Sequence, residues 1–318
     1  DSQRVISAMS HRDPTIQHVA IRETAKRNLL DLTLSKLDSV KDPGNLYRAL
    51  GMMHRSTTVR QLEQRLTQPN EKHKKLILKT LCRLYFKEAE WEGQSWGTRP
   101  DTRGPYYQPV KWEETENIHR LLMGELQTCN PKVAAYLMNE LAKNRVDLTD
   151  SLDQIVTLAT SNRELTEPAV SVLVKAKKLT PASIEFLISS VGTKVPITTL
   201  EEVVSLLTRT NDPKTIPIIF RALDILNEPK HPRQYINQTR DQFFNSKLCK
   251  SNLQYFADNS LQLGNSGFWA DCALLTLATQ KNLTTEDKTK CSDVIRRQCL
   301  NPQSQCRIVS AATYLKNH

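Results

Sequence analysis

A regular series of proline steps is the feature that most constrains the fold of this chain. A capping residue followed by Pro at the first helical position is typical of a helix start. In the middle of the chain these prolines stand at 168, 181, 196, 213 and 229, so one helix and a short turn fit between neighbours. Two such intervals make one helical hairpin of about 30–33 residues. We therefore predict an all-α fold, an α-solenoid of HEAT-like helical hairpins. The steps are Asp13-Pro14, Asp42-Pro43, Asn130-Pro131, Glu167-Pro168, Thr180-Pro181, Val195-Pro196, Asp212-Pro213, Glu228-Pro229 and Asn301-Pro302.

Hydrophobic periodicity supports the same fold class. Apolar residues recur at helical spacing in segments 15–39, 148–160 and 199–208. Only 9 of the 318 residues are glycine, which argues against a doubly wound nucleotide-binding fold and against a turn-rich all-β protein. We expect roughly fifteen or sixteen helices in a single helical-repeat domain over residues 1–318.

The chain is basic, with a formal net charge of +10. The excess lies in residues 1–90 and 231–318, whereas residues 91–130 carry a net negative charge. A basic surface favours polyanions such as nucleic acid, although a solvated basic face explains the same charge. The residues Lys72, His73, Lys74, Lys75 and Lys79 form a local basic cluster that fits either interpretation. No apolar run approaches about 18 residues, so the sequence predicts no membrane span.

Seven cysteines occur, and none forms a CxxC pair. We expect mainly buried thiols, with one or more disulfides or a metal site as alternatives. Cys299 and Cys306 flank the Asn301-Pro302 turn, and only the tertiary structure decides whether they meet. The sequence contains no phosphate-binding, dinucleotide-binding, zinc-protease or serine-hydrolase motif, so it predicts no catalytic residue, no metal and no cofactor.

Residues 91–112 interrupt the helical pattern. This segment reads WEGQSWGTRPDTRGPYYQPVKW, and its glycines and prolines exclude a helix. We expect helices over about 71–90 and 113–128 on either side, which makes the segment one long ordered loop insertion between helices. Its Trp and Tyr rings would cover a helix pair as a rigid staple, or its two arginines would bind a carboxylate, sulfate, phosphate, sugar or protein chain. The candidate ligand- or partner-binding residues are Trp96, Arg99, Asp101, Arg103, Tyr106, Tyr107 and Trp112.

The run YFKEAEWEGQSWGTRPDTRGPYYQPVKWEETENI, residues 85–118, also carries a resemblance. It resembles a signature in the HEAT-like region of large secreted planctomycete-type proteins described as membrane-bound dehydrogenases, which carry a β-propeller before the helical repeats and a c-type cytochrome after them. The match is densest over residues 96–107 and at Trp112 and Glu113. The resemblance implies that this chain corresponds to the helical region alone and lies in an extracytoplasmic or periplasmic compartment. Since the sequence has no CxxCH motif, we expect no covalently bound haem.

These observations favour a non-catalytic scaffold or protein-interaction module. Its partner would be another protein or a neighbouring domain of a larger chain. A basic helical-repeat protein that binds nucleic acid is one alternative, but the aromatic segment lies in the only net-negative region. The other alternative is an enzyme or binder that uses the 91–112 loop for a sugar or an anionic ligand.

Overall fold

The computed structural model describes residues 1–67, 71–89, 108–176, 178–192, 195–259, 265–278 and 284–300. Within these ranges the chain is built from helices, joined by one pair of two-residue strands. The predicted all-α fold is therefore confirmed. Contacts between residues divide the chain into two compact units, Asp1–Lys178 and Leu179–His318, and each is described by itself. The single repeat domain expected over residues 1–318 stays a prediction.

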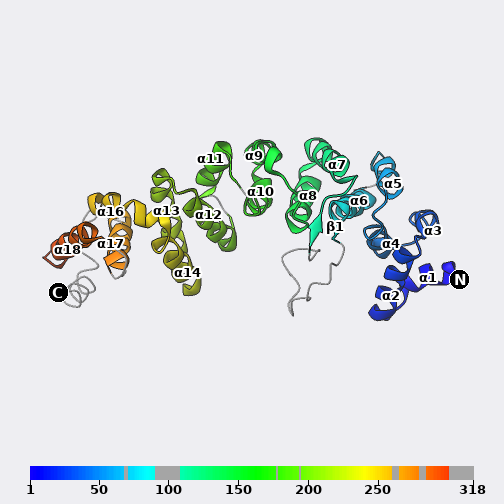
Figure 1. The fold of residues 1–318 in the computed structure, drawn as a ribbon, viewed down its shortest axis with the longest axis horizontal. Helices are drawn as coiled ribbons and strands as arrows, with labels where there is room; N and C mark the ends of the chain where they lie inside the picture. Colours follow the sequence, from blue (N-terminus) through cyan, green and yellow to red (C-terminus); the bar gives the residue numbers. More distant parts are fainter. Residues whose placement is uncertain are drawn as a thin grey trace. The chain divides into compact units, whose positions relative to one another are not determined.

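The first unit stacks helical hairpins in chain order. Helices α2, α4, α6, α8 and α10 form one layer in which each helix contacts the next (Figure 1). Helices α3, α5, α7 and α9 form a second layer, and each contacts its chain neighbour in the first. This arrangement is an α-solenoid, as predicted. The elements are α1 (Ser2–Ser7), α2 (Pro14–Lys26), α3 (Leu30–Lys36), α4 (Gly44–Leu50), α5 (Ser56–Leu66), α6 (Glu71–Leu84), β1 (Lys87–Glu88), β2 (Pro109–Val110), α7 (Thr115–Thr128), α8 (Pro131–Lys143), α9 (Leu152–Ser161) and α10 (Thr166–Leu173), with 3-10 turns at Ala8–Ser10, Thr149–Ser151 and Arg163–Leu165.

The second unit packs in the same manner. Helix α12 contacts α13 and α14, and α17 contacts α13, α14, α16 and α18. Here a cluster of phenylalanines forms part of the core, where the Phe243 ring lies 6.1 Å from Phe220 and 6.3 Å from Phe256. The elements are α11 (Pro181–Ser190), α12 (Ile197–Thr210), α13 (Ile216–Leu226), α14 (Arg233–Phe244), α15 (Lys247–Ser251), α16 (Leu253–Asn259), α17 (Asn265–Ala278) and α18 (Thr285–Leu300), with a 3-10 turn at Pro213–Thr215.

Each layer is held by apolar side chains at helical spacing. In α6, Ile77, Leu78, Leu81 and Leu84 are buried, and this face meets α4 and α8. Full burial of a leucine or isoleucine stabilises a fold by about 1.5–3 kcal/mol, so these side chains stabilise the packing of α6 against its two neighbours. The periodic leucines therefore serve as core, as expected.

Four of the nine predicted capped starts are confirmed, at Asp13-Pro14, Asn130-Pro131, Thr180-Pro181 and Asp212-Pro213. Helix α10 begins at Thr166, so Glu167-Pro168 lies inside its first turn, and α4 and α12 begin only after Pro43 and Pro196. The Asn301-Pro302 step lies outside the described residues. Asn130 Oδ1 accepts the Val133 N–H at 3.0 Å, Asp13 Oδ1 accepts the Thr15 N–H at 2.8 Å, and Thr180 Oγ1 accepts the Ser183 N–H at 3.2 Å. The Glu228-Pro229 start is wrong. Helix α13 ends at Leu226 and α14 begins only at Arg233, because the Pro232 step two residues after Lys230 provides the actual entry.

Segment 15–39 is two helices rather than one. Helix α2 ends because Asn28 adopts a left-handed conformation at φ 51°. The Asn28 N–H then bonds the Ala25 carbonyl at 3.0 Å and the Leu29 N–H bonds the Thr24 carbonyl at 3.1 Å. This pair of bonds is a Schellman motif, which an asparagine can form in place of glycine. The described residues hold eighteen α-helices, more than the number expected, and this break accounts for one of the additional helices.

Candidate functional site

Of the candidate residues that the sequence points to, Trp112 is the one within the described part of the chain. Trp96, Arg99, Asp101, Arg103, Tyr106 and Tyr107 lie outside the described residues. What the structure describes is the base from which the 91–112 loop leaves the first unit. The helix expected over residues 71–90 ends earlier, at Leu84, and the helix expected from residue 113 is α7, which begins at Thr115.

Three consecutive carbonyls at the end of α6 each have a side-chain partner from elsewhere in the chain. Trp112 Nε1 donates to the Leu84 carbonyl at 2.7 Å, and Thr115 Oγ1 donates to the Tyr85 carbonyl at 2.9 Å. His54 Nε2 lies 2.8 Å from the Phe86 carbonyl. The last carbonyls of a helix have no partner within the helix, so the bond from Trp112 satisfies the Leu84 carbonyl, and the other two bonds fix the backbone directly after α6. We call these six residues the loop anchor.

His54 must carry its proton on Nε2 in the loop anchor, because a carbonyl oxygen can only accept. Burial is the largest cause that lowers the pKa of His54, and it outweighs the opposing effect of the bond to Phe86. The Trp112 ring meets the His54 ring edge-on, with centroids 5.4 Å apart and planes at 74°. The neutral His54 imidazole thus packs against the Trp112 indole and also donates a hydrogen bond to the Phe86 carbonyl.

The two ends of the loop are joined by a short antiparallel ladder. Strand β1 pairs with β2 in the register Lys87 with Val110 and Glu88 with Pro109. The Ala89 N–H donates to the Gln108 carbonyl at 2.8 Å, and the Gln108 N–H donates to Glu88 Oε1 at 2.6 Å. No pattern in the sequence indicates this ladder, because a two-residue strand is too short to show alternation of apolar and polar residues.

The anchor assigns Trp112 a structural role. Its indole N–H, its backbone N–H and its ring are all engaged within the chain, since the backbone N–H also donates to Thr115 Oγ1 at 2.9 Å. For Trp112, these contacts support the interpretation of residues 91–112 as a segment held rigidly against a helix pair. The ligand-binding interpretation of the other six stays a prediction.

A cavity of about 600 Å³ lies beside the ladder in the first unit. It is lined by Phe86, Pro109 and Lys111 from the loop base and by the segment that follows α8, including Arg145 and Asp147. Lys111 is already engaged, because its Nζ lies 2.8 Å from Glu116 Oε1. We call this space the loop-base cavity.

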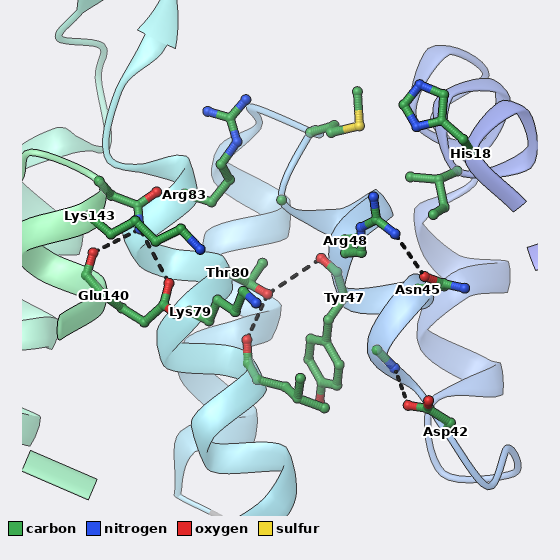
Figure 2. Close-up of a pocket in the computed structure, with 16 residues that line it drawn as sticks. His18, Asp42, Asn45, Tyr47, Arg48, Lys79, Thr80, Arg83, Glu140 and Lys143 are labelled. Atoms are coloured by element: carbon green, nitrogen blue, oxygen red, sulfur yellow. Dashed lines mark hydrogen bonds between the residues drawn. The ribbon is translucent and has the colours of Figure 1, made fainter. Parts of the chain in front are cut away.

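A second cavity of about 430 Å³ is lined by residues of α2, α4, α6 and α8, the successive helices of one layer. Figure 2 shows four basic side chains around it: Arg48 from α4, Lys79 and Arg83 from α6, and Lys143 from α8. We call it the basic groove. Its floor is partly apolar, with Ile21, Tyr47 and Leu76 among the lining residues. Burial raises the pKa of Tyr47 to about 12, so its hydroxyl stays neutral, and this hydroxyl lies 2.9 Å from His73 Nδ1.

Sequence reasoning did not find the basic groove. The cluster at residues 72–79 contributes Lys79 to it, but Lys74 turns to Glu125 on α7 at 2.6 Å. Arg48 and Lys143 are far apart in the chain and carry no pattern that could have linked them. Only the contacts of α4 with α6 and of α6 with α8 bring them to one face.

The ranges that the structure describes contain neither a metal-binding group of side chains nor a membrane-spanning helix. No three His, Cys, Asp or Glu side chains there are grouped so that they could hold a metal ion. Among the same residues, no helix is both long enough and apolar enough to cross a bilayer. Cys82 and Cys249 are buried thiols and Cys129 is a half-buried one, while Cys306 lies beyond the described residues.

No protein-family model and no curated protein matches this chain. Among solved structures, it is similar to an engineered protein at 12% identity and a TM-score of 0.44, with 99% of this chain and 98% of that chain covered. It is also similar to a chain from a structure that describes a phosphorylation switch in the interaction between cadherin and beta-catenin. That match has 15% identity and a TM-score of 0.40, and covers 98% of this chain and 69% of that one.

Proposed function

We propose that this chain is a non-catalytic scaffold or protein-interaction module, with the 91–112 loop and the face around its base as a contact surface. We further propose, from the sequence resemblance, that it belongs to a larger extracytoplasmic protein of several domains. Its partner would then be a neighbouring domain of that protein or a separate protein.

The observation that carries this proposal is the loop anchor. Three side chains satisfy the Leu84, Tyr85 and Phe86 carbonyls, and the ladder joins the two ends of the loop. A loop whose base is fixed loses less conformational entropy on binding, so binding loops gain affinity when a rigid scaffold positions them.

The test is a selection of random peptides displayed on phage against the intact chain. A matched variant replaces residues 91–107 with a short Gly-Ser linker and keeps the whole loop anchor. We expect the enriched peptides to bind the intact chain and not the linker variant. Both proteins should melt at the same temperature. The proposal fails if no peptide is enriched, or if every enriched peptide binds the linker variant equally well.

The Arg99→Ala/Arg103→Ala variant separates protein contact from binding of small anions by the loop. Calorimetry with sulfate, phosphate, an acidic sugar and duplex DNA compares it with the intact chain. A ligand that binds only the intact chain, with unchanged melting of the variant, would replace the protein-interaction role by an anion-binding one.

A further inference from the structure

Cysteines gather on the packed helices of the second unit. Cys249 stands in α15, Cys272 in α17, and Cys291 and Cys299 in α18, and all four carry thiols. Thiols on different helices can be joined by a disulfide when packing brings their Cα atoms close together.

Cys272 and Cys299 pack against the same pair of core residues. Helices α17 and α18 lie side by side (Figure 1), and Leu275 and Ile295 form a buried cluster between them. The half-buried Cys272 and Cys299 are both packed against this cluster. Cys272 is three residues before Leu275, and Cys299 is four residues after Ile295. Each cysteine therefore lies on the same face of its helix as its core residue, one turn away.

The directions of the two helices place the cysteines on the same side of that cluster. Helix α17 ends at Ala278 and α18 begins at Thr285, and packed helices with so short a connection run antiparallel. One turn back along α17 and one turn forward along α18 therefore lead in the same direction in space. Cys272 and Cys299 thus face each other across the helix pair.

The spacing of packed helices suits a disulfide at this place. Helix axes lie about 8–10 Å apart and each Cα lies about 2.3 Å from its axis, so facing Cα atoms come within roughly 3.5–5.5 Å. A disulfide needs Cα atoms about 4.4–6.8 Å apart. Because these ranges overlap, a bond between Cys272 and Cys299 requires little movement of the backbone.

Exposure separates this pair from the other two thiols of the unit. Cys249 and Cys291 are 0% and 1% exposed, whereas Cys272 and Cys299 are half-buried. Burial is the main cause that raises the pKa of Cys249, and the nearby Cys291 adds to this effect. Since the thiolate is the form that attacks a disulfide, the buried pair is protected and the half-buried pair can meet a dissolved oxidant.

We propose that Cys272 and Cys299 form a reversible disulfide that ties α18 to α17. The oxidant is a small-molecule disulfide such as oxidised glutathione. One cysteine thiolate attacks a glutathione sulfur, so a mixed disulfide forms and one glutathione thiolate leaves. The second cysteine thiolate attacks the protein sulfur of the mixed disulfide and releases the other glutathione thiolate. Two protein thiols thus lose two electrons to one glutathione disulfide, and their two protons end on the two glutathione thiols.

The expected consequence is a second unit that is harder to unfold. The bond closes the chain from Cys272 to Cys299 into a ring, and a ring of this kind stabilises a fold by limiting the unfolded state. The pair lies in the second unit and the 91–112 loop in the first, so this inference is independent of the proposed interaction role.

The test compares the intact chain in a buffer with oxidised glutathione and in a buffer with dithiothreitol. Remaining thiols are blocked with iodoacetamide in denaturant, and tryptic peptides are identified by mass spectrometry. Trypsin cuts after Lys281 and Arg297, so Cys272, Cys291 and Cys299 fall in three different peptides. We expect the Cys272 and Cys299 peptides to be linked in the oxidised sample. The oxidised protein should melt at least about 5 °C higher than the reduced protein, and dithiothreitol should reverse the rise.

Variants locate the effect. Cys272→Ser and Cys299→Ser should each abolish the linked peptide and the rise in melting temperature. The matched control is Cys129→Ser, which removes a half-buried thiol of the first unit and should keep both. Cys306→Ser should also keep both. If a Ser variant at 272 or 299 fails to fold in circular dichroism under reducing conditions, Ala replaces Ser there, and the peptide map of the intact chain decides the pairing in either case.

Any of three results would overturn the proposal. One is an intact chain that shows no linked peptide after oxidation. Another is a link from Cys299 to Cys306, or from Cys249 to Cys291, in place of the expected one. The third is a link between Cys272 and Cys299 that leaves the melting temperature unchanged, since the bond would then not hold the two helices together.

Discussion

Replacing Trp112 with Phe is the sharpest perturbation of the loop anchor. The change keeps an aromatic ring against His54 but removes the indole N–H that bonds the Leu84 carbonyl at 2.7 Å. Loss of one such bond costs about 1 kcal/mol, and the smaller ring leaves a gap worth about 1 kcal/mol more. We therefore expect the free energy of unfolding to fall by about 2 kcal/mol.

Urea unfolding followed by circular dichroism measures this loss. A unit the size of Asp1–Lys178 shifts its melting temperature by about 2–4 °C per kcal/mol, so we expect a decrease of about 4–8 °C. Hydrogen exchange gives a local readout, because the Ala89 N–H bonds the Gln108 carbonyl at the base of the loop. If the lost energy opens the base, exchange at Ala89 should rise roughly thirtyfold.

The matched control is Trp269→Phe in the second unit. Trp269 Nε1 donates to Asp224 Oδ1 at 2.6 Å, so this change also removes an indole hydrogen bond but lies away from the loop. It should destabilise the protein and leave Ala89 exchange unchanged. A Trp112→Phe variant that loses less than about 0.5 kcal/mol and keeps Ala89 protected would refute the reasoning, since the indole would then not hold the loop base.

Three more predictions follow from caps and titrating groups. Asn130→Ala removes the cap of α8 and should cost about 1 kcal/mol in urea unfolding; an unchanged midpoint would mean that water replaces the cap. The lowered pKa of His54 means that its neutral form stabilises the fold fully above about pH 6.5, and that this stability is lost as the pH falls below that value. Wild type should therefore lose more stability than His54→Gln between about pH 7.5 and 5, and the opposite order would contradict a neutral His54. Burial raises the pKa of both Cys82 and Cys129, but Cys129 is only half-buried, so iodoacetamide should modify Cys129 first in a peptide map; prior modification of Cys82 would contradict the buried α6 core.

The features that the sequence predicted correctly are local ones. A cap such as Asn130 bonds a backbone group three residues away, and a proline after it excludes other conformations, so both can be read from a short stretch of sequence. The same holds for the periodic leucines of α6. Local patterns were therefore enough for the all-α fold.

Local patterns failed where two conformations are compatible with the same residues. The stretch after Leu84 could continue as a helix by composition, yet α6 stops there, and Trp112, Thr115 and His54 bond the carbonyl of Leu84 and the two that follow it. These partners lie about thirty residues away in the chain, at a distance where propensity carries no information.

The basic groove depends on tertiary structure alone. Arg48, Lys79 and Lys143 each stand where a solvated lysine or arginine is ordinary on a helix surface. They share one potential only because α4, α6 and α8 pack in a single layer, and stacking of helices sets which surface residues become neighbours. The sequence by itself determined the all-α fold, and the tertiary structure decided which charges meet, because contacts between helices link residues that no spacing in the chain connects.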